Sequence, residues 1–451
     1  MAIQAWKDKI FELGRQAGFS DMEVYYQSGK NFEATVFEGD ISKYSVSDEK
    51  GMAFRGILNG NMGYAYTEII TEEAIAHLVE EARSNAQIIE TEEEVFIYKG
   101  GQAPKPLNLY NESLQSVKNE DKLKFLLDVE KHAKALDERV FRVAYNLYSD
   151  SENTLAIANS HGLDISERSN LALAYLSVVV KSGEEQKSGT KFVYGNDFTK
   201  YDAKAMAEEA VEEALSQFGA KSMTSGDYEV VIRNKESASL LQCFAPNFSS
   251  ENVQKNLSKL IGKQNEQVAS TVVTITDDPH LEGGLMSRSF DGEGVATKKH
   301  NVIENGILKT FLYNLKTANV EGVKSTGNGS KASFKSSVGI SPSNFYMNTG
   351  KLNQKDLIEE IDKGLYITGL QGLHSGTNAI SGEFSLQASG YLIENGRLTR
   401  PVSQITVAGN YFDMLFDIEK VASDLEFTLP SGSSAYGSPS IRVKSLTVSG
   451  E

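Results

Sequence analysis

The sequence predicts an α+β protein with an N-terminal mixed helix and strand domain, residues 1–220, and a mainly antiparallel β-rich domain, residues 226–451. The first half carries both helical and strand periodicities. The segment 219–227 is small, polar and aperiodic, as is typical of a domain boundary. Beyond it, glycine, serine, threonine and asparagine become frequent and long helical periods nearly vanish. The 451 residues fit two or three domains of ~150 residues each.

Four segments of the first half repeat apolar residues every three or four positions, which predicts amphipathic helices. They are residues 3–17, a helix with Thr71 as its N-cap, a helix capped by Asn119 and a helix over about residues 203–217. Apolar and polar residues alternate elsewhere, which predicts a meander over residues 21–66 and three strands between Phe141 and Phe192. Residues 100–118 carry two prolines and no periodicity, so a loop is expected there.

The second half predicts strands with few helices. A strand is expected over residues 228–233 and a short helix over residues 235–247. Asn353 is expected to cap another helix, residues 354–363, which Gly364 would stop.

One internal repeat stands out in this half. Residues 302–306 (VIENG) are echoed by residues 392–396 (LIENG), 90 positions later. Asn-Gly supplies the two positive φ values of a type I′ hairpin turn, so two similar hairpins are expected. The pattern fits a duplicated β unit, although Asn-Gly hairpins are common enough for coincidence.

Composition excludes several classes of protein. Lys and Arg total 45 against 61 Asp and Glu, a net charge of −16, which argues against direct coating of nucleic acid. The single cysteine excludes an internal disulfide framework and fits a reducing compartment. The longest apolar stretch, residues 171–180, is far below the ~20 residues that cross a bilayer. We expect a cytoplasmic protein that binds neither nucleic acid nor membrane.

The familiar catalytic signatures are missing. There is no phosphate-binding loop, no complete dinucleotide fingerprint and no nucleophile elbow. Cys243 lies between Gln242 and Phe244 without a neighbouring charge, which favours a buried inert thiol over a nucleophile. The segment 277–282 (DDPHLE) could bind a metal through its carboxylates and imidazole, but its composition favours a turn. Residues 291–294 (DGEG) are interpreted as a hairpin connection.

Two small-residue stretches have no packing explanation in the sequence. They are the glycine-rich run 369–376 and the strand-like residues 376–391. Small residues on a strand let another backbone approach, so strand addition of a peptide or partner is one interpretation. An edge strand flanked by loose loops is the other.

Several motifs together resemble the TldD/PmbA family, whose PmbA branch is also called TldE. The resemblance covers the second half and, more diffusely, the first. It is carried by residues 237–263 (SASLLQCFAPNFSSENVQKNLSKLIGK), 294–314 (GVATKKHNVIENGILKTFLYN), 325–330 (STGNGS), 381–410 (SGEFSLQASGYLIENGRLTRPVSQITVAGN) and 442–450 (RVKSLTVSG). It implies a two-subunit metalloprotease that cleaves small unfolded peptides. The TldD-type subunit carries His-Glu-x-x-x-His on a helix and a later cysteine that completes the metal site.

This chain departs from that motif. Gln242 stands where the first histidine would be, Cys243 where the glutamate would be and Asn247 where the second histidine would be. The tail 428–440 contains no cysteine. Amides are poor transition-metal ligands and no general base remains, so the resemblance places the chain in the PmbA/TldE branch. We therefore expect no catalytic residue and no metal in this chain, with zinc held by the partner subunit.

The resemblance also implies partners and a surface. The expected partners are a TldD-type, metal-bearing homologue and an unfolded peptide, and a homodimer is an option for the isolated chain. The residues expected to line the peptide cleft or the subunit contact lie on one strand: Ser381, Gly382, Phe384, Ser385, Ala388 and Gly390.

Two alternative functions remain open. One is a stand-alone metallopeptidase with an unorthodox site around Asp277, His280 and Glu282. The other is a regulatory protein that acts on DNA gyrase, as an older description of the family suggests.

Overall fold

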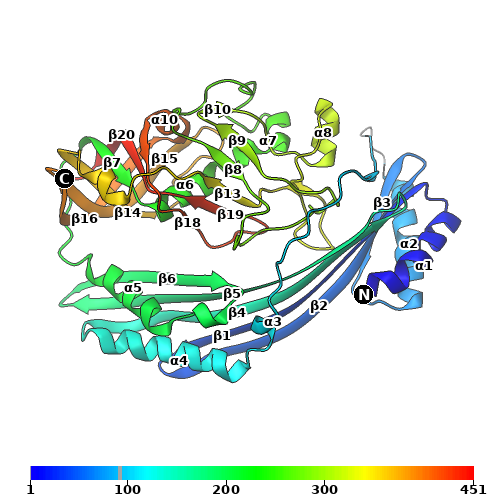
Figure 1. Cartoon of the computed structure of the whole chain (residues 1–451), viewed down its shortest axis with the longest axis horizontal. Coiled ribbons are helices and arrows are strands. Elements are labelled where there is room, and N and C mark those ends of the chain that lie inside the picture. The colour runs from blue at the N-terminus through cyan, green and yellow to red at the C-terminus, as the bar shows by residue number, and fades with distance from the viewer. Residues whose placement is uncertain (1, 90–93) are drawn as a thin grey trace.

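The computed structural model describes residues 2–89 and 94–451, with side chains from residue 5 onward. It confirms the predicted α+β class. A long, curved sheet forms the N-terminal half, and the C-terminal half sits in its concave face (Figure 1). Among the described residues, no helix combines the length and apolar character that crossing a membrane requires.

The N-terminal sheet has six strands in the order β3-β2-β1-β4-β5-β6, and every neighbouring pair is antiparallel. The strands are β1 (Asp21–Phe37), β2 (Asp40–Leu58), β3 (Asn61–Thr67), β4 (Val140–Asn159), β5 (Asp164–Ser182) and β6 (Glu185–Gly195). The helices are α1 (Ala2–Gln16), α2 (Glu72–Ile88), α3 (Glu112–Gln115), α4 (Asn119–Leu136), η1 (Phe198–Lys200) and α5 (Ala203–Leu215).

Strand β1 shows how the sheet separates two layers. Its Val24 packs with α2 and its Ala34 packs with α4 and α5, so these helices cover one face of the sheet. Tyr25 points the other way and is buried with Phe290 and Phe334 of the C-terminal half. The alternation of side chains along a strand therefore assigns one face to the helices and the other to the C-terminal half.

The helix starts agree with the sequence in part. Thr71 caps α2, because its hydroxyl accepts a hydrogen bond from the Ala74 amide. The prediction that Asn119 caps α4 is wrong, since Asn119 is the first helical residue and Lys118 occupies the cap without a side-chain bond. The side-chain nitrogen of Asn119 instead donates to the Tyr44 hydroxyl. The expected loop 100–118 contains the short helix α3.

The C-terminal half contains two six-stranded sheets. One has the order β10-β9-β8-β13-β19-β18: β8 (Ile275–Asp277), β9 (His300–Glu304), β10 (Ile307–Leu308), β13 (Asn344–Met347), β18 (Glu426–Phe427) and β19 (Ala435–Ser438). The other has the order β16-β15-β14-β7-β20-β17: β7 (Gly226–Ile232), β14 (Lys363–Gln371), β15 (Glu383–Glu394), β16 (Arg397–Asn410), β17 (Ile418–Val421) and β20 (Ile441–Ser449). Strands β11 (Gly329–Ser330) and β12 (Gly339–Ile340) form a separate pair.

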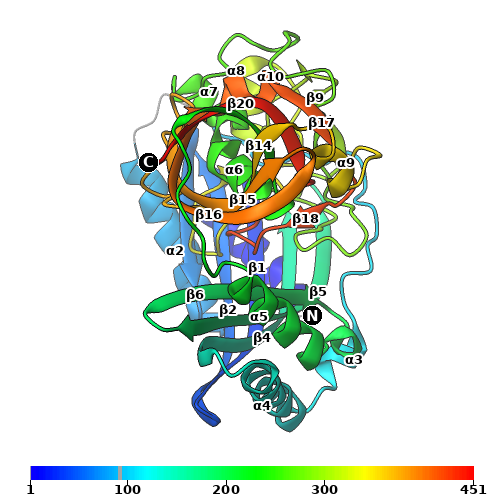
Figure 2. The ribbon, with the colours of Figure 1, turned by 90° about the vertical axis from the view of Figure 1, so that its left-hand side faces the viewer.

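The second of these sheets closes on itself. Strand β16 also pairs with β20, so β7, β14, β15, β16 and β20 form a ring, which Figure 2 shows nearly end-on. Helix α6 (Asn234–Phe244) contributes Leu240, Leu241 and Phe244 to the core that these strands line. The remaining helices of this half are η2 (Ala245–Phe248), α7 (Ser250–Gln254), α8 (Leu315–Glu321), α9 (Gln354–Ile358) and α10 (Tyr411–Phe416).

Helix α9 is shorter than the sequence suggested. Asn353 caps it through a capping box with Asp356, as expected, but the helix ends at Ile358. Gly364 does not stop it and lies within β14. A Cβ on Gly364 would stand 2.5 Å from the Glu229 carbonyl oxygen, so glycine here permits the close approach of β7 and β14.

The repeated Asn-Gly motifs form two equivalent hairpins. Asn305 and Gly306 have φ values of 49° and 82°, and Asn395 and Gly396 have 50° and 73°, as a type I′ turn requires. In each copy the first hairpin strand pairs antiparallel with the strand before it, β8 with β9 and β14 with β15. The two units lie in different sheets and share one three-strand arrangement.

Candidate functional site

The stretch that resembles a metal-binding helix begins on α6 and ends in η2. Gln242 and Cys243 lie in the last turn of α6 and are half-buried, while Asn247 lies in η2 and is fully buried. Leu240, Leu241 and Phe244 form the apolar face of α6, and this face packs into the core. Packing against the core therefore holds the helix in place.

Asn247 acts as a structural cross-link. Its amide nitrogen donates to the Ala379 carbonyl at 2.6 Å and to the Phe244 carbonyl at 3.2 Å. Its amide oxygen accepts from the Lys259 amide at 2.8 Å. These bonds join η2 to two distant loops and occupy the polar atoms of the side chain.

Cys243 is a weak ligand in this setting. Burial raises the pKa of its thiol, and a hydrogen bond with Thr377 opposes the shift. A protonated thiol neither attacks nor binds zinc well. Within residues 2–89 and 94–451, no three His, Cys, Asp or Glu side chains gather as a metal site. The donors Gln242, Cys243 and Asn247 therefore do not fit zinc.

The small-residue strand is β15, and it is not an edge. It pairs with β14 on one side and β16 on the other, which corrects the expectation of an edge strand or of strand addition there. Phe384 and Ala388 are buried in the core of the ring, and Gly390 is buried against β14. The close backbone approach that the glycine allows is made by the chain's own neighbouring strand.

The other predicted residues of this stretch lie at its start. Ser381 and Gly382 form the turn before β15, where Gly382 has a φ of 85° and the Ser381 carbonyl accepts from Asn410. Ser385 is exposed on β15. Ser385 and Ser381 are thus the members of the predicted set whose positions suit contact with another molecule.

The acidic segment after β8 is structural. Asp277 accepts hydrogen bonds from the Ser343 amide at 2.7 Å and from the Asn328 side chain at 2.7 Å. Asp278 accepts from the His280 amide and forms an ion pair of 2.9 Å with Lys299. Both carboxylates thereby organise the turn that the sequence favoured over a metal site.

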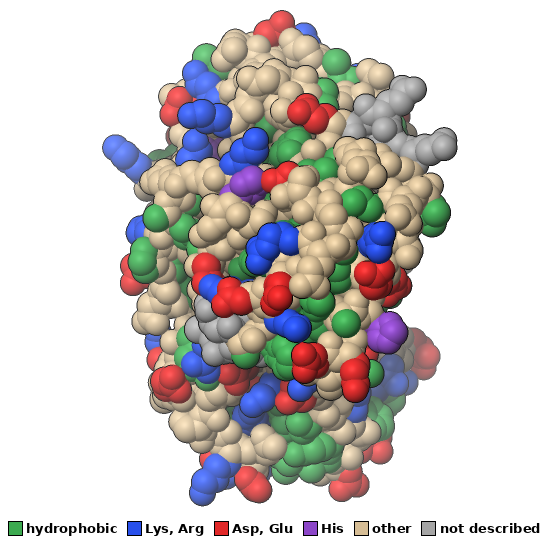
Figure 3. Space-filling view, turned by 90° about the vertical axis from the view of Figure 1, so that its right-hand side faces the viewer, with side chains coloured by type: hydrophobic (Ala, Val, Ile, Leu, Met, Phe, Trp, Pro, Cys, Tyr) green, Lys and Arg blue, Asp and Glu red, His purple; other side chains and the backbone are tan. Residues whose placement is uncertain are grey.

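A cavity between the two halves was not predicted as a site. Its volume is about 480 Å³, and residues of β2, β3 and the segment 331–338 line it. Figure 3 views the molecule from the end at which β3 and α8 lie in Figure 1, and acidic and basic side chains intermingle there. The sequence signal for this site is the pair of carboxylates in residues 291–294, whose composition by itself favours a hairpin connection.

These two carboxylates are buried beside the cavity. Asp291 accepts hydrogen bonds from the amides of Glu293, Val295 and Gly329, which hold its position. Glu293 lines the cavity and accepts from the Leu315 amide at 2.7 Å. Burial raises the pKa of both carboxyl groups, and the charge of Asp291 raises that of Glu293 further.

Arg55 and Lys331 are two of the four cationic residues that line the cavity. Arg55 forms a two-pronged ion pair with the buried Glu23, with N–O distances of 2.7 and 3.0 Å. Lys331 lies over the rings of Tyr25 and Tyr64, with its nitrogen 4.5 and 5.3 Å from their centres. Burial, followed by the charge of Arg55, lowers the pKa of Lys331 to about 8.

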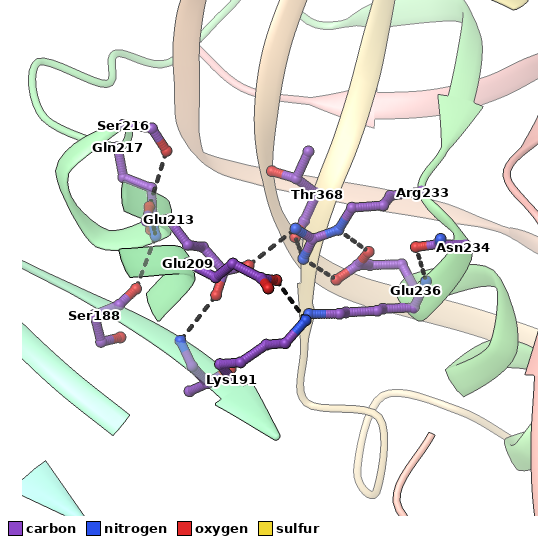
Figure 4. Close-up of polar contacts among 12 residues, drawn as sticks. Ser188, Lys191, Glu209, Glu213, Ser216, Gln217, Arg233, Asn234, Glu236 and Thr368 are labelled. Carbon is purple, nitrogen blue, oxygen red and sulfur yellow. Dashed lines mark hydrogen bonds and ion pairs between the residues drawn. The ribbon is translucent and has the colours of Figure 1, made fainter. Parts of the chain in front are cut away.

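A second polar cluster sets the position of α6 (Figure 4). Arg233, the residue just before α6, pairs with Glu236 of the same helix at 2.8 Å and with Glu213 of α5 at 2.9 Å. The same guanidinium donates to the Thr368 carbonyl in β14. This one side chain therefore connects α6 to the N-terminal half and to the ring.

Three family models match the chain in succession. They describe domain 1, the central domain and the C-terminal domain of the PmbA/TldA metallopeptidases, over residues 22–86, 112–218 and 225–450. The chain belongs to the PmbA/TldD family.

Solved structures of the family share the whole architecture. A Thermotoga maritima protein described as a candidate modulator of a DNA gyrase is 33% identical, with a TM-score of 0.91 over 99% of this chain and 100% of that one. TldE from Thermococcus kodakarensis is 25% identical, with a TM-score of 0.90 over 98% of this chain and 100% of that one.

Relatives compared by sequence include both branches of the family. A metalloprotease TldD homologue of Haemophilus influenzae is 27% identical over 98% of this chain and 95% of its own. Identity alone does not separate the two branches.

Replacing Gly390 should destabilise the ring of this PmbA/TldD protein. A Cβ at this position would lie 1.8 Å from the Tyr366 carbonyl oxygen, which is backbone and cannot rotate away. Gly390→Ala should lower the free energy of unfolding by about 2 kcal/mol or more. Urea denaturation measures this. Ser385→Ala, on the exposed face of the same strand, is the control and should change stability by less than about 0.5 kcal/mol. Equal stability of the two variants would contradict the packing argument.

The buried Glu293 should make stability depend on pH. Because its pKa is raised in the folded state, the folded protein binds the proton more tightly, and stability is lost as pH rises above the ordinary carboxyl value of about 4.3. Glutamine at position 293 cannot ionise. The melting temperature of Glu293→Gln relative to that of the wild type should therefore rise between pH 5 and pH 8. Thermal unfolding at several pH values measures the difference. Glu282→Gln, at an exposed carboxylate, should show a constant difference. A gain that shrinks with rising pH would refute the assignment.

Proposed function

We propose that this chain is the non-catalytic subunit of a TldD/TldE-type metallopeptidase that degrades or processes small unfolded peptides. The observation that carries the proposal is the set of side chains in the α6 stretch, where Gln242, Cys243 and Asn247 replace the family's metal ligands and base. The deep burial and full hydrogen bonding of Asn247 support it, because they give the segment a structural task.

Catalysis in such a complex is assigned to the partner. Zinc held by imidazole and thiolate ligands would polarise a scissile carbonyl and acidify a bound water, and a glutamate would accept the proton. Gln242 and Asn247 supply neither charge nor basicity, and Cys243 is held as a thiol. We therefore place the zinc in a TldD-type homologue that carries His-Glu-x-x-x-His.

The contribution of this chain is to shape the space around that metal. The cluster of Arg233, Glu213 and Glu236 fixes α6 against both halves of the molecule, so the chain can present a rigid wall. Ser381, which is half-buried in the turn before β15, and Ser385, which is exposed on that strand, are proposed to face the peptide or the partner. A wall around the metal would admit unfolded peptides and exclude folded proteins. We place the complex in the cytoplasm, in keeping with the single cysteine.

The two alternatives receive less support. A stand-alone metal site around Asp277, His280 and Glu282 would need the Asp277 carboxylate, which already accepts hydrogen bonds from Ser343 and Asn328. The description of the Thermotoga maritima relative is the observation that favours action on gyrase.

Reconstitution tests the proposal. The purified chain should show no metal-dependent cleavage of a short unfolded peptide. Mixed with a homologue that carries His-Glu-x-x-x-His, it should co-elute in size-exclusion chromatography, and the mixture should cleave the peptide. Cys243→Ser in this chain should leave that activity within about twofold, because the thiol is assigned no chemistry.

The matched control changes the first histidine of the partner's motif to Gln and should abolish cleavage while the complex still forms. Cleavage by the isolated chain would refute the proposal, as would activity lost on Cys243→Ser in a complex that still forms. Recovery of gyrase and no peptidase subunit from a pull-down would favour the regulatory alternative.

A further inference from the structure

The cavity between the two halves has no role in the function proposed above. It is lined by residues of both halves, and its volume of about 480 Å³ lies within the usual range for small-ligand sites, ~300–1,000 Å³. Its walls combine apolar surface from Met62, Val95 and Phe96 with charged groups. Residues 325–330, the small polar motif noted in the sequence, lead into Lys331 at its edge.

Lys331 is the unusual feature of this cavity. Its side chain is half-buried, and its buried nitrogen has no hydrogen-bond partner in the part of the chain that the structure describes. The tyrosine rings beneath it offer cation–π contacts but no hydrogen-bond acceptor in line with its N–H groups. A buried ammonium without an acceptor is costly, so folding alone does not account for this residue.

The neighbouring charges are already engaged. Arg55 pairs with Glu23, and Lys335 at the rim pairs with Glu68. The Asp291 carboxylate accepts hydrogen bonds from three backbone amides. The Lys331 nitrogen, in contrast, has no hydrogen-bond acceptor among the described residues.

We propose that this cavity binds the carboxylate of a small ligand, with the Lys331 ammonium as its hydrogen-bond donor, and that the ligand is a short peptide. The choice of a peptide rests on the proposed function, whereas the carboxylate rests on the cavity alone. A phosphate is disfavoured because Glu293 and Asp291 lie close by, and a second negative charge would be repelled. The apolar walls suit the side chains of a peptide.

Calorimetric titration of the full-length chain tests this with three probes. They are trialanine, trialanine amide and N-acetyl-Ala-Glu-Ala-amide. Trialanine should bind at least about tenfold more tightly than its amide, because only trialanine offers a terminal carboxylate to the ammonium. Binding of the third probe at the affinity of trialanine would also support a carboxylate site and would identify a side-chain carboxylate as its ligand. Equal binding of trialanine and its amide, or no binding of any probe, would overturn the proposal.

Variants locate the site. Lys331→Met should remove the preference for trialanine over its amide, while its melting temperature should match or exceed that of the wild type because a costly buried charge is gone. Lys331→Gln serves the same purpose if the first variant does not fold. Lys355→Met, at an exposed lysine of α9 that does not line the cavity, should keep trialanine affinity within about twofold. A preference that survives in folded Lys331 variants would also overturn the proposal.

This test is separate from that of the proposed function. Binding is measured on the chain alone, so failure to assemble with a histidine-bearing homologue leaves its result unaffected. Conversely, a complex that forms and cleaves peptides while the isolated chain ignores carboxylates would refute the cavity proposal only.

Discussion

The contact between the concave face of the N-terminal sheet and the C-terminal half is the constraint on which the rest of the structure depends. Phe334 packs against β2 at Gly51, where a Cβ would stand 2.1 Å from its ring. Burying a side chain of this size contributes about 1.5–3 kcal/mol. Beside it the buried pair Glu23–Arg55 must keep both partners, because a lone charge in that position would be strongly destabilising. Apolar fit, together with the hydrogen bonds that Ser289 donates to Glu167 of β5, thus fixes the two halves together, and the cavity forms between them.

Local patterns predicted much of the fold. Thr71 and Asn353 cap helices, and the two Asn-Gly pairs turn hairpins, because each of these effects acts within a few residues. The predictions that Gly364 ends a helix and that β15 is an edge strand are wrong for the same reason. A glycine that admits a neighbouring strand looks the same in sequence as one that ends a helix or exposes an edge. Which strand lies beside it is decided by tertiary structure.

The candidate site divides in the same way. The loss of metal ligands could be read at Gln242, Cys243 and Asn247, since residue type alone determines what can bind zinc. The cavity could not, because Arg55, Glu293 and Lys331 are far apart in sequence and meet only when the halves close. The carboxylates in residues 291–294 resembled ordinary turn chemistry, and only burial distinguishes them from it.

The two Asn-Gly hairpins share a steric limit that bears on whether the two units arose by duplication. A Cβ on Gly306 would stand 2.3 Å from the Ala269 carbonyl oxygen, and one on Gly396 would stand 2.3 Å from that of Glu359. Ala269 and Glu359 are separated by the same 90 positions as the glycines themselves. Each unit therefore bars any larger residue at the same spot, for the same steric reason. If the two units arose by duplication, this steric limit would keep glycine at the same position in both copies while the surrounding residues diverged.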